Sequence, residues 1–259
     1  MAGKILTRKG TVIGYEHRNK GKNNQDSLVC PDKPIVIEGK EHFLGIVLDG
    51  CSGDIKKSQT EVGSRLLGTF AASEIPLILH SHVPIDQVPD VLYQRMVGYV
   101  GQVAKSTVVG DPQVVCDFIL NTFLCTVVGF LMDGDRVVTF TAGDGALIVN
   151  DQTIAIEEDN TPRYLAYHQV DRRILGKAAT LLPKTFATQV YSRSEIQRIA
   201  VCTDGVLKSR SSEWRFDPNE LFNYERGVKG GVQWLLNGYG ETSLVSDDTT
   251  VVTWEQFPS

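Results

Sequence analysis

The segment from residue 124 to residue 156, LCTVVGFLMDGDRVVTFTAGDGALIVNDQTIAI, constrains the fold more than any other part of the chain. It contains four short runs rich in β-branched residues, and Asp, Gly and Asn separate these runs, which is typical of strands joined by tight turns. Strands joined in this way form hairpins, and the two strands of a hairpin are antiparallel. The segment therefore predicts antiparallel sheet and argues against a simple alternation of strands and helices.

Strand-like runs and longer helical patterns occupy the rest of the chain. Further strands are predicted at HFLGIVL, RIAVC and TTVVTW. Two helices are predicted at TEVGSRLLGTFAASEI, which we expect Pro76 to end, and at VPDVLYQRMVGYVGQVAKS. A third is predicted at GDPQVVCDFILNTFL, with Asp111 as its N-cap and Pro112 at its first helical position. A fourth is predicted at DPNELFNYE, which repeats this opening at Asp217 and Pro218. No repeat or flexible linker divides the sequence, so residues 1–259 are predicted to form one layered α+β domain.

Charge and composition argue against several kinds of partner. The net charge of −5 provides no basic field for nucleic acid or for an anionic membrane surface. The longest apolar stretch, FLCTVVGFLM, is shorter than the roughly 18–20 residues that a membrane span needs. The five cysteines form no Cys-x-x-Cys pair, which favours reduced thiols over a disulfide framework or a zinc site. We therefore expect a cytoplasmic protein that binds neither nucleic acid nor membrane.

Asp-Gly pairs occur in two different settings in this chain. Asp133-Gly134 lies between two alternating apolar runs, so it predicts an ordinary hairpin turn. Asp49-Gly50 ends an apolar run that is followed by a helix, and Asp204-Gly205 ends one that is followed by a segment without alternation. Both acids are thus predicted at the end of a buried strand, where glycine lets the backbone turn and leaves its carbonyl open to close approach.

Three more carboxylates lie where strands begin. Asp247 and Asp248 precede TTVVTW, and Asp26 precedes the first predicted strand. Each alone fits a solvated turn, but adjacent carboxylates repel each other unless a cation or solvent offsets their charge. Carboxylates at several strand ends, with almost no His or Cys beside them, suit Mg²⁺ or Mn²⁺ better than zinc. Two such ions about 3.5–4 Å apart are the usual device for phosphoester cleavage.

Five motifs in order, NNQDS, VLDGCSG, TAGDG, VCTDG and SDDTTVV, resemble those of the metal-dependent protein phosphatases, the type 2C serine/threonine phosphatase family. The resemblance spans about Tyr15 to Trp254 and is that of a bacterial-type, single-domain member. It implies an α+β fold of two packed antiparallel β-sheets flanked by helices, a four-layer sandwich with two Mn²⁺ or Mg²⁺ ions at one end.

The resemblance also implies roles for individual residues. Asp49 would bridge both ions, and the carbonyl of Gly50 would bind the second ion. Asp204 and Asp247 would hold the first ion. Asp26 would bind or orient the waters on the ions, and it is predicted together with Asp49 to be catalytic.

Asp144, in TAGDG, matches the position that often holds a third ion in this family, although the same segment also fits a simple hairpin. Two other positions depart from the family pattern. Gln25 stands where many members have Glu, and it is neutral. Cys51 stands where animal members often have a His suspected of donating a proton, and bacterial-type members have an apolar residue there.

The phosphate-binding cation is the third departure. The family's Arg lies five residues before the first Asp, where this chain has Gly21. Arg18, Lys20 and Lys22 are nearby, and Arg18 is the candidate because its planar fork can bind phosphate through two hydrogen bonds, although a basic loop is also typical of a solvated surface. His17 is a candidate proton donor, but a lone loop histidine also fits a bystander.

The resemblance implies hydrolysis of phosphoserine or phosphothreonine in protein substrates, by a water activated between two divalent cations. No Cys-x5-Arg loop follows Cys51 or Cys202, which argues against a cysteine-dependent phosphatase. Two alternatives stay open. The chain could be a catalytically impaired phosphatase-fold protein that binds phosphoproteins or regulates a partner, or a structural domain whose Asp-Gly pairs are all turns.

Overall fold

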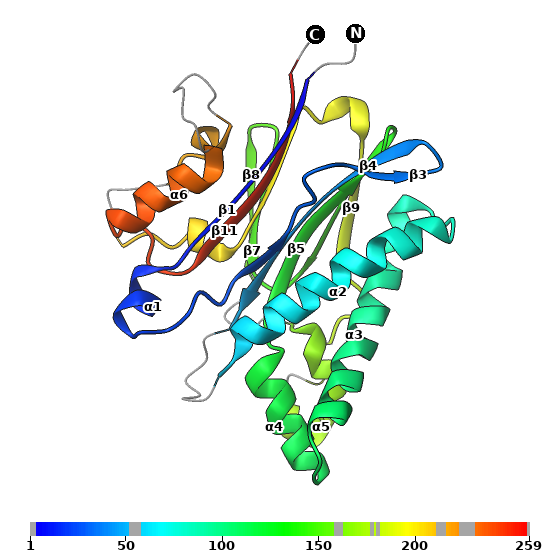
Figure 1. Cartoon of the computed structure of the whole chain (residues 1–259), viewed down its shortest axis with the longest axis vertical. Coiled ribbons are helices and arrows are strands. Elements are labelled where there is room, and N and C mark those ends of the chain that lie inside the picture. The colour runs from blue at the N-terminus through cyan, green and yellow to red at the C-terminus, as the bar shows by residue number, and fades with distance from the viewer. Residues whose placement is uncertain are drawn as a thin grey trace.

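Two antiparallel sheets lie face to face at the centre of the protein, and helices cover the outer face of each (Figure 1). The computed structural model describes residues 4–51, 58–157, 163–176, 179, 182–210, 216–222 and 231–257. Within these residues, one sheet has the strand order β1-β11-β10-β7-β8, and the other has the order β2-β4-β5-β6-β9 with β3 paired to β4. The predicted α+β fold, with two antiparallel sheets flanked by helices, is confirmed.

The elements have the following bounds. The strands are β1 (Ile5–Val12), β2 (Ser27–Val29), β3 (Ile35–Ile37), β4 (Lys40–Gly50), β5 (Cys125–Met132), β6 (Arg136–Ala142), β7 (Gly145–Val149), β8 (Gln152–Ile156), β9 (Ala187–Ser192), β10 (Arg198–Cys202) and β11 (Thr249–Gln256). The α-helices are α1 (Tyr15–Asn19), α2 (Thr60–His80), α3 (Val88–Thr107), α4 (Pro112–Thr122), α5 (Arg172–Leu175) and α6 (Gly231–Glu241).

The central strands are buried on both faces, which explains their nearly continuous apolar sequences. In β4, Ile46 and Leu48 face the core that α2, α3 and α4 cover, whereas Val47 faces the other sheet. In β10, Val201 faces the space between the sheets, and Ala200 faces the core under α6. Successive side chains of a strand point to opposite faces, so each sheet contributes to two of the three hydrophobic cores.

Helix α2 does not end at Pro76, contrary to the prediction. It continues to His80 with Pro76 inside it. A proline removes one backbone hydrogen bond and strains the preceding turn. The last turn nevertheless stays helical, because Ile75 and Ile78 are fully buried in the core against the six-stranded sheet.

The helix predicted at DPNELFNYE is a short 3-10 helix, Pro218–Leu221, with Asp217 as its N-cap. Residues 223–225 of that motif lie outside the described part of the chain.

Two helix glycines differ in how closely their neighbours approach, and this difference gives a prediction for stability. A Cβ added at Gly63 would lie 1.8 Å from the carbonyl oxygen of Thr122, whereas one added at Gly98 would meet no atom within 4 Å. We therefore expect Gly63→Ala to lower the free energy of unfolding by about 1–3 kcal/mol. Gly98→Ala should raise it by about 0.5–1 kcal/mol, because alanine favours the helix. Urea denaturation of both variants checks this, and equal effects would contradict the close packing of α2 on α4.

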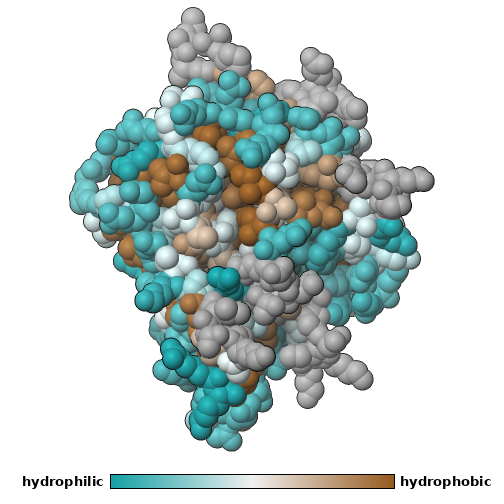
Figure 2. All heavy atoms as spheres, turned by 180° about the vertical axis from the view of Figure 1, so that it is seen from behind, coloured by the Kyte–Doolittle hydropathy of each residue, from teal (hydrophilic) through white to brown (hydrophobic). Residues whose placement is uncertain are grey.

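Helix α2 is long and apolar enough, by length and composition, to cross a membrane. It packs on β2 and β4 of the six-stranded sheet, and 44% of its most apolar window is buried inside the protein. Figure 2 shows the molecule from behind, where hydrophobic residues gather in the middle of the surface among hydrophilic ones. The large hydrophobic side chains that are exposed, such as Val36, Leu77, Val190 and Trp234, belong to separate elements.

Candidate metal centre

Asp49 lies within the final residues of a strand, not in a turn. Asp49 pairs with Thr126 and Gly50 pairs with Cys125 in the antiparallel ladder between β4 and β5. A Cβ added at Gly50 would lie 2.8 Å from the carbonyl oxygen of Gln25, so this position accepts a close backbone approach that a larger residue would prevent. Strand β4 thus carries the Asp49 carboxyl group to one end of the sandwich.

The strand pairing brings the other predicted acids to the same end. Asp26 immediately precedes β2, whose first residue, Ser27, pairs with Leu48 of β4. Asp204 follows β10, and Asp247 lies just before β11, which pairs with β10. The acids therefore come from both sheets, and they meet because each lies at the end of a strand that reaches this edge.

The carboxyl groups of these acids raise one another's pKa values. Burial raises the pKa of Asp49 well above its usual range, and the charges of Asp26, Asp204 and Asp247 raise it further. Burial also raises the pKa of Asp26, as does the charge of Asp248. Burial raises the pKa of Asp204, although Lys208 opposes this rise. Carboxyl groups that raise one another's pKa form a cluster in which full ionisation needs a compensating cation.

Two oxygen atoms in the cluster lack a partner. The Oδ1 atoms of Asp26 and Asp204 are buried, and neither has a hydrogen-bond partner among the described residues. The other oxygen of Asp26 accepts a hydrogen bond from the Thr203 hydroxyl at 2.9 Å. A buried acceptor without a donor is costly, and a hard cation would satisfy it. The donor set therefore fits a divalent ion beside Asp26 and Asp49.

A lysine is bound to the remaining two carboxylates. Lys208 Nζ lies 2.7 Å from an oxygen of Asp204 and 2.9 Å from one of Asp247. Burial opposes the charge of Lys208, but the two carboxylates outweigh this effect and raise its pKa. Within the described residues, no three His, Cys, Asp or Glu side chains are arranged to hold an ion as they stand. Lys208 therefore binds one oxygen of each acid that the resemblance assigns to the first ion, while Asp204 Oδ1 has no partner among the described residues. The roles of Asp204 and Asp247 as metal ligands stay predictions. Sequence patterning did not single out Lys208.

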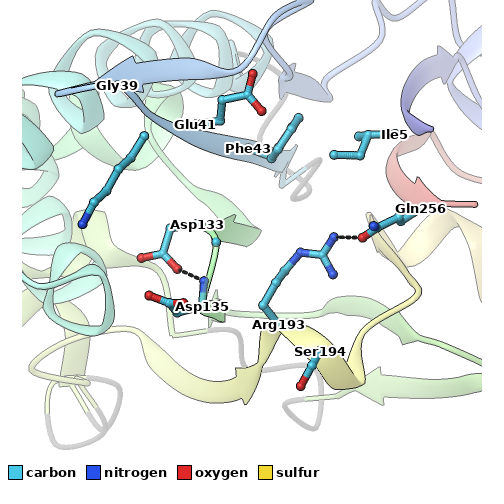
Figure 3. Close-up of a pocket in the computed structure, with 11 residues that line it drawn as sticks. Ile5, Gly39, Glu41, Phe43, Asp133, Asp135, Arg193, Ser194 and Gln256 are labelled. Carbon is cyan, nitrogen blue, oxygen red and sulfur yellow. Dashed lines mark hydrogen bonds between the residues drawn. The ribbon is translucent and has the colours of Figure 1, made fainter. Parts of the chain in front are cut away.

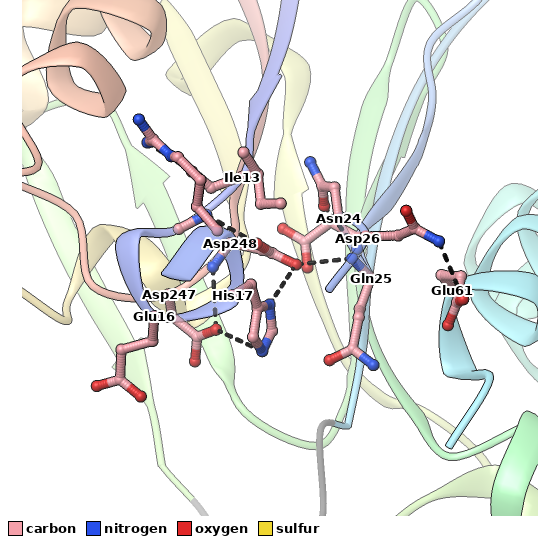
Figure 4. Close-up of polar contacts among 12 residues, drawn as sticks. Ile13, Glu16, His17, Asn24, Gln25, Asp26, Glu61, Asp247 and Asp248 are labelled. Atoms are coloured by element: carbon pink, nitrogen blue, oxygen red, sulfur yellow. Dashed lines mark hydrogen bonds and ion pairs between the residues drawn. The ribbon is translucent and has the colours of Figure 1, made fainter. Parts of the chain in front are cut away.

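Asp248 joins three segments beneath the cluster. Its buried carboxylate accepts hydrogen bonds from the backbone N–H of Gly14 at 2.8 Å and of Gln25 at 2.7 Å. His17 Nδ1 lies 2.8 Å from the same carboxylate, and His17 Nε2 lies 3.9 Å from Asp247. Figure 4 shows these groups pointing toward one another from α1, from the segment before β2 and from the residues just before β11. His17 is thus a buried residue of α1 inside the site and not a solvated loop residue, and its role as a proton donor stays a prediction.

The contacts of Arg18 do not support its predicted role as the phosphate-binding cation. Its guanidinium donates to the carbonyl oxygen of Gly240 at 2.8 Å and to that of Ile13 at 3.3 Å. Gly240 lies in the last turn of α6, where carbonyl groups lack helical partners and cations bind them favourably. Arg18 therefore links α1 to α6, and its role as the phosphate-binding cation stays a prediction that these contacts do not support.

Asp144 does not lie in a hairpin, so the hairpin interpretation of its segment is wrong. Strand β6 belongs to the six-stranded sheet and β7 to the other, so the chain crosses between the sheets at Gly143 and Asp144. Gly143 has a φ of +84°, a conformation that glycine adopts without strain. The pairing of Ala142 with Val127 places this crossing at the same end of the six-stranded sheet as Asp49. A third-ion role for Asp144 stays a prediction.

Asp133-Gly134 is the structural turn that the sequence predicts. Asp133 Oδ1 accepts hydrogen bonds from the backbone N–H of Asp135 and Arg136, which closes the hairpin between β5 and β6. This turn lines a cavity of about 780 Å³ together with Lys40, Glu41, Phe43 and Arg193, among other residues (Figure 3). The cavity lies at the start of β4, whereas the carboxylate cluster lies at its end.

The raised pKa values predict how pH changes the stability of the metal-free protein. Asp26 and Asp49 keep their protons to higher pH in the folded chain than in the unfolded chain, where the carboxyl pKa is about 4. Their contribution to stability is therefore fully present below that value and is lost as the pH rises through the folded pKa values. Urea denaturation in EDTA should show this loss, and Asp49→Asn should show a smaller loss. An equal loss in both proteins would contradict the clustering.

The model of the family described as "Protein phosphatase 2C" matches residues 13–236. No curated protein matches the chain in sequence.

Solved structures match over nearly the whole chain at low sequence identity. The serine-threonine phosphatase 2C from Toxoplasma gondii is 12% identical, has a TM-score of 0.59, and covers 99% of this chain and 98% of its own. The serine/threonine phosphatase Stp1 from Staphylococcus aureus is 12% identical, has a TM-score of 0.57, and covers 100% of this chain and 97% of its own. The catalytic domain of the serine threonine protein phosphatase PstP, solved in complex with two manganese ions, is 14% identical with a TM-score of 0.49, covering 98% of this chain and 99% of its own.

Proposed function

Because this chain belongs to the protein phosphatase 2C family, we propose that it hydrolyses phosphoserine and phosphothreonine esters in proteins. The observation that carries the proposal is the meeting of Asp26, Asp49 and Asp204 with Asp247 at one end of the sandwich, although they are far apart in the sequence. A purely structural domain gains nothing from a cluster of carboxylates that repel one another, so the cluster favours a functional site.

The residues at this end divide into two groups of oxygen ligands. Asp26, Asp49 and the Gly50 carbonyl would hold one divalent ion, Mn²⁺ or Mg²⁺. Asp204 and Asp247 would hold the other ion of the family, and the Lys208 ammonium, which binds one oxygen of each, opposes that ion. When bound, divalent ions supply an acidified water and positive charge near the phosphoryl group.

The chain's own groups can hold and position a proton in this site. Thr203 fixes one oxygen of Asp26 at 2.9 Å, which leaves its Oδ1 atom free and buried. A carboxyl group with a raised pKa can keep or release a proton nearer to neutral pH than an ordinary one, as a general acid or base must. Asp248 holds His17 in place, so the imidazole lies close to Asp247 without being a free loop side chain.

A second candidate function is a catalytically impaired phosphatase-fold protein that binds phosphoproteins or regulates a partner. The observation that favours it is the Lys208 ammonium, which binds Asp204 and Asp247 where the resemblance expects an ion. Gln25 stands where many family members have Glu, so the site has one carboxylate fewer than theirs. The Gln25 Nε2 donates to the Thr60 hydroxyl at 3.0 Å.

An assay on a phosphothreonine peptide separates the two functions. We expect phosphate release in Mn²⁺ or Mg²⁺ and none after EDTA is added in excess, with activity restored when the metal is returned. Activity that persists in EDTA would contradict a metal-dependent reaction. Binding of the phosphopeptide without any release of phosphate in either metal would support the second candidate instead.

A further inference from the structure

Backbone hydrogen bonds tie Lys208 to the two segments that carry the acids it binds, one beside Asp204 and one beside Asp247. Asp204–Val206 forms a 3-10 turn, and the Lys208 N–H donates to the carbonyl oxygen of Gly205. The Lys208 carbonyl oxygen accepts hydrogen bonds from the Ser246 N–H at 3.2 Å and from its hydroxyl at 3.0 Å. Ser246 directly precedes Asp247, so the same contacts that place Lys208 also place one of its two partners.

The Lys208 ammonium makes close contacts with both carboxylates at once. Its Nζ lies 2.7 Å from Asp204 Oδ2 and 2.9 Å from Asp247 Oδ2, which are charge-assisted hydrogen-bond distances. A divalent ion held by these two acids would have to share them with the ammonium or displace it from their Oδ2 atoms, and it would bring a second positive charge next to the ammonium. The lysine and the ion therefore oppose each other's binding at this position.

We infer that Lys208 is a built-in cation that competes with a divalent metal ion for Asp204 and Asp247. This inference rests on the metal centre of the proposed function and specifies how that centre departs from its family. An ammonium offsets the charge of the two acids as an ion would. It has no coordination position for a water, however, so it cannot activate one as a divalent ion does. About half of the Lys208 side chain is exposed, so the ammonium can swing out into solvent when an ion replaces it.

Binding of Mn²⁺ to the metal-free protein tests this competition without any measurement of activity. We expect Lys208→Gln to bind Mn²⁺ about tenfold more tightly than the parent, or to bind one ion more per chain, because the ion pairs of a half-exposed lysine no longer oppose the ion. Isothermal titration calorimetry gives affinity and stoichiometry, and the rise in melting temperature with Mn²⁺ gives an independent measure.

Lys9→Gln is a matched control. Lys9 Nζ lies 2.7 Å from Asp32, the same length as the Lys208–Asp204 contact, and its side chain is 41% exposed against 47% for Lys208. The same change of charge at Lys9 should leave Mn²⁺ binding unaltered. In a second variant, Asp247→Asn added to Lys208→Gln should remove the gain, because the ion then loses one of the two carboxylates.

The outcomes separate this inference from the proposed function. A gain of Mn²⁺ binding in Lys208→Gln supports the inference even where no chain releases phosphate, in which case the proposed function is wrong. Unchanged or weaker Mn²⁺ binding in Lys208→Gln overturns the inference, while metal-dependent phosphate release by the parent would leave the proposed function in place. A gain that is equal in Lys9→Gln also overturns it, because the effect is then one of net charge.

Discussion

Asp49→Asn is expected to lower kcat/KM for a phosphothreonine peptide by about a thousandfold, the scale of loss seen when a group that stabilises the transition state directly is removed. Asp49 interacts electrostatically with all three of the other acids, since the charges of Asp26, Asp204 and Asp247 each raise its pKa. Asparagine keeps the shape of the side chain but removes the negative charge that a divalent ion needs. The measurement is steady-state phosphate release in saturating Mn²⁺.

The stability of the same variant distinguishes a lost function from a lost fold. Without metal, Asp49→Asn should be at least as stable as the parent at neutral pH, because one buried charge among like charges is gone. Asp133→Asn is the matched control, since it changes the other Asp-Gly pair on the same sheet, in a turn that lies at the far end of β5. Loss of activity in Asp133→Asn, or full activity in Asp49→Asn, would contradict the assignment of the two Asp-Gly pairs.

Asp248→Ala is expected to lower the free energy of unfolding by about 3–5 kcal/mol, because it leaves several buried hydrogen-bond donors without an acceptor. The Asp248 side chain is 1% exposed, and it accepts from two backbone N–H groups and contacts His17. These partners belong to the segment between β1 and β2, which has little secondary structure of its own. Chemical denaturation of the metal-free protein measures the loss.

Two further variants sharpen this result. Asp248→Asn keeps one acceptor oxygen and should cost less, about 1–2 kcal/mol. Asp32→Ala removes a carboxylate whose side chain is 88% exposed and whose partner is Lys9, so it should leave the stability nearly unchanged. If Asp248→Ala is as stable as Asp32→Ala, the carboxylate does not hold these segments together.

Local sequence was enough to predict several elements, because their determinants are neighbours in the chain. Asp111 caps α4 through the N–H groups of Gln113 and Val114, as its position before Pro112 predicts. The apolar runs of β4, β5 and β10 predict buried strands, because both of their faces are covered. Strand β1 has no such apolar run, because most of its residues are only partly buried. It forms a strand through its pairing with β11 along its whole length.

The sequence by itself predicted the candidate acids, because acids at the ends of apolar runs, two of which (Asp49 and Asp204) precede glycine, are a property of short motifs. Only the tertiary structure decided which of them meet, because β2 beside β4 and β10 beside β11 join segments that are distant in the chain. It also decided that Arg18 binds the end of α6, that the chain changes sheets at Asp144, and that Lys208 lies between Asp204 and Asp247. A side chain's neighbours across a sheet depend on strand order and register, and no local pattern contains that information.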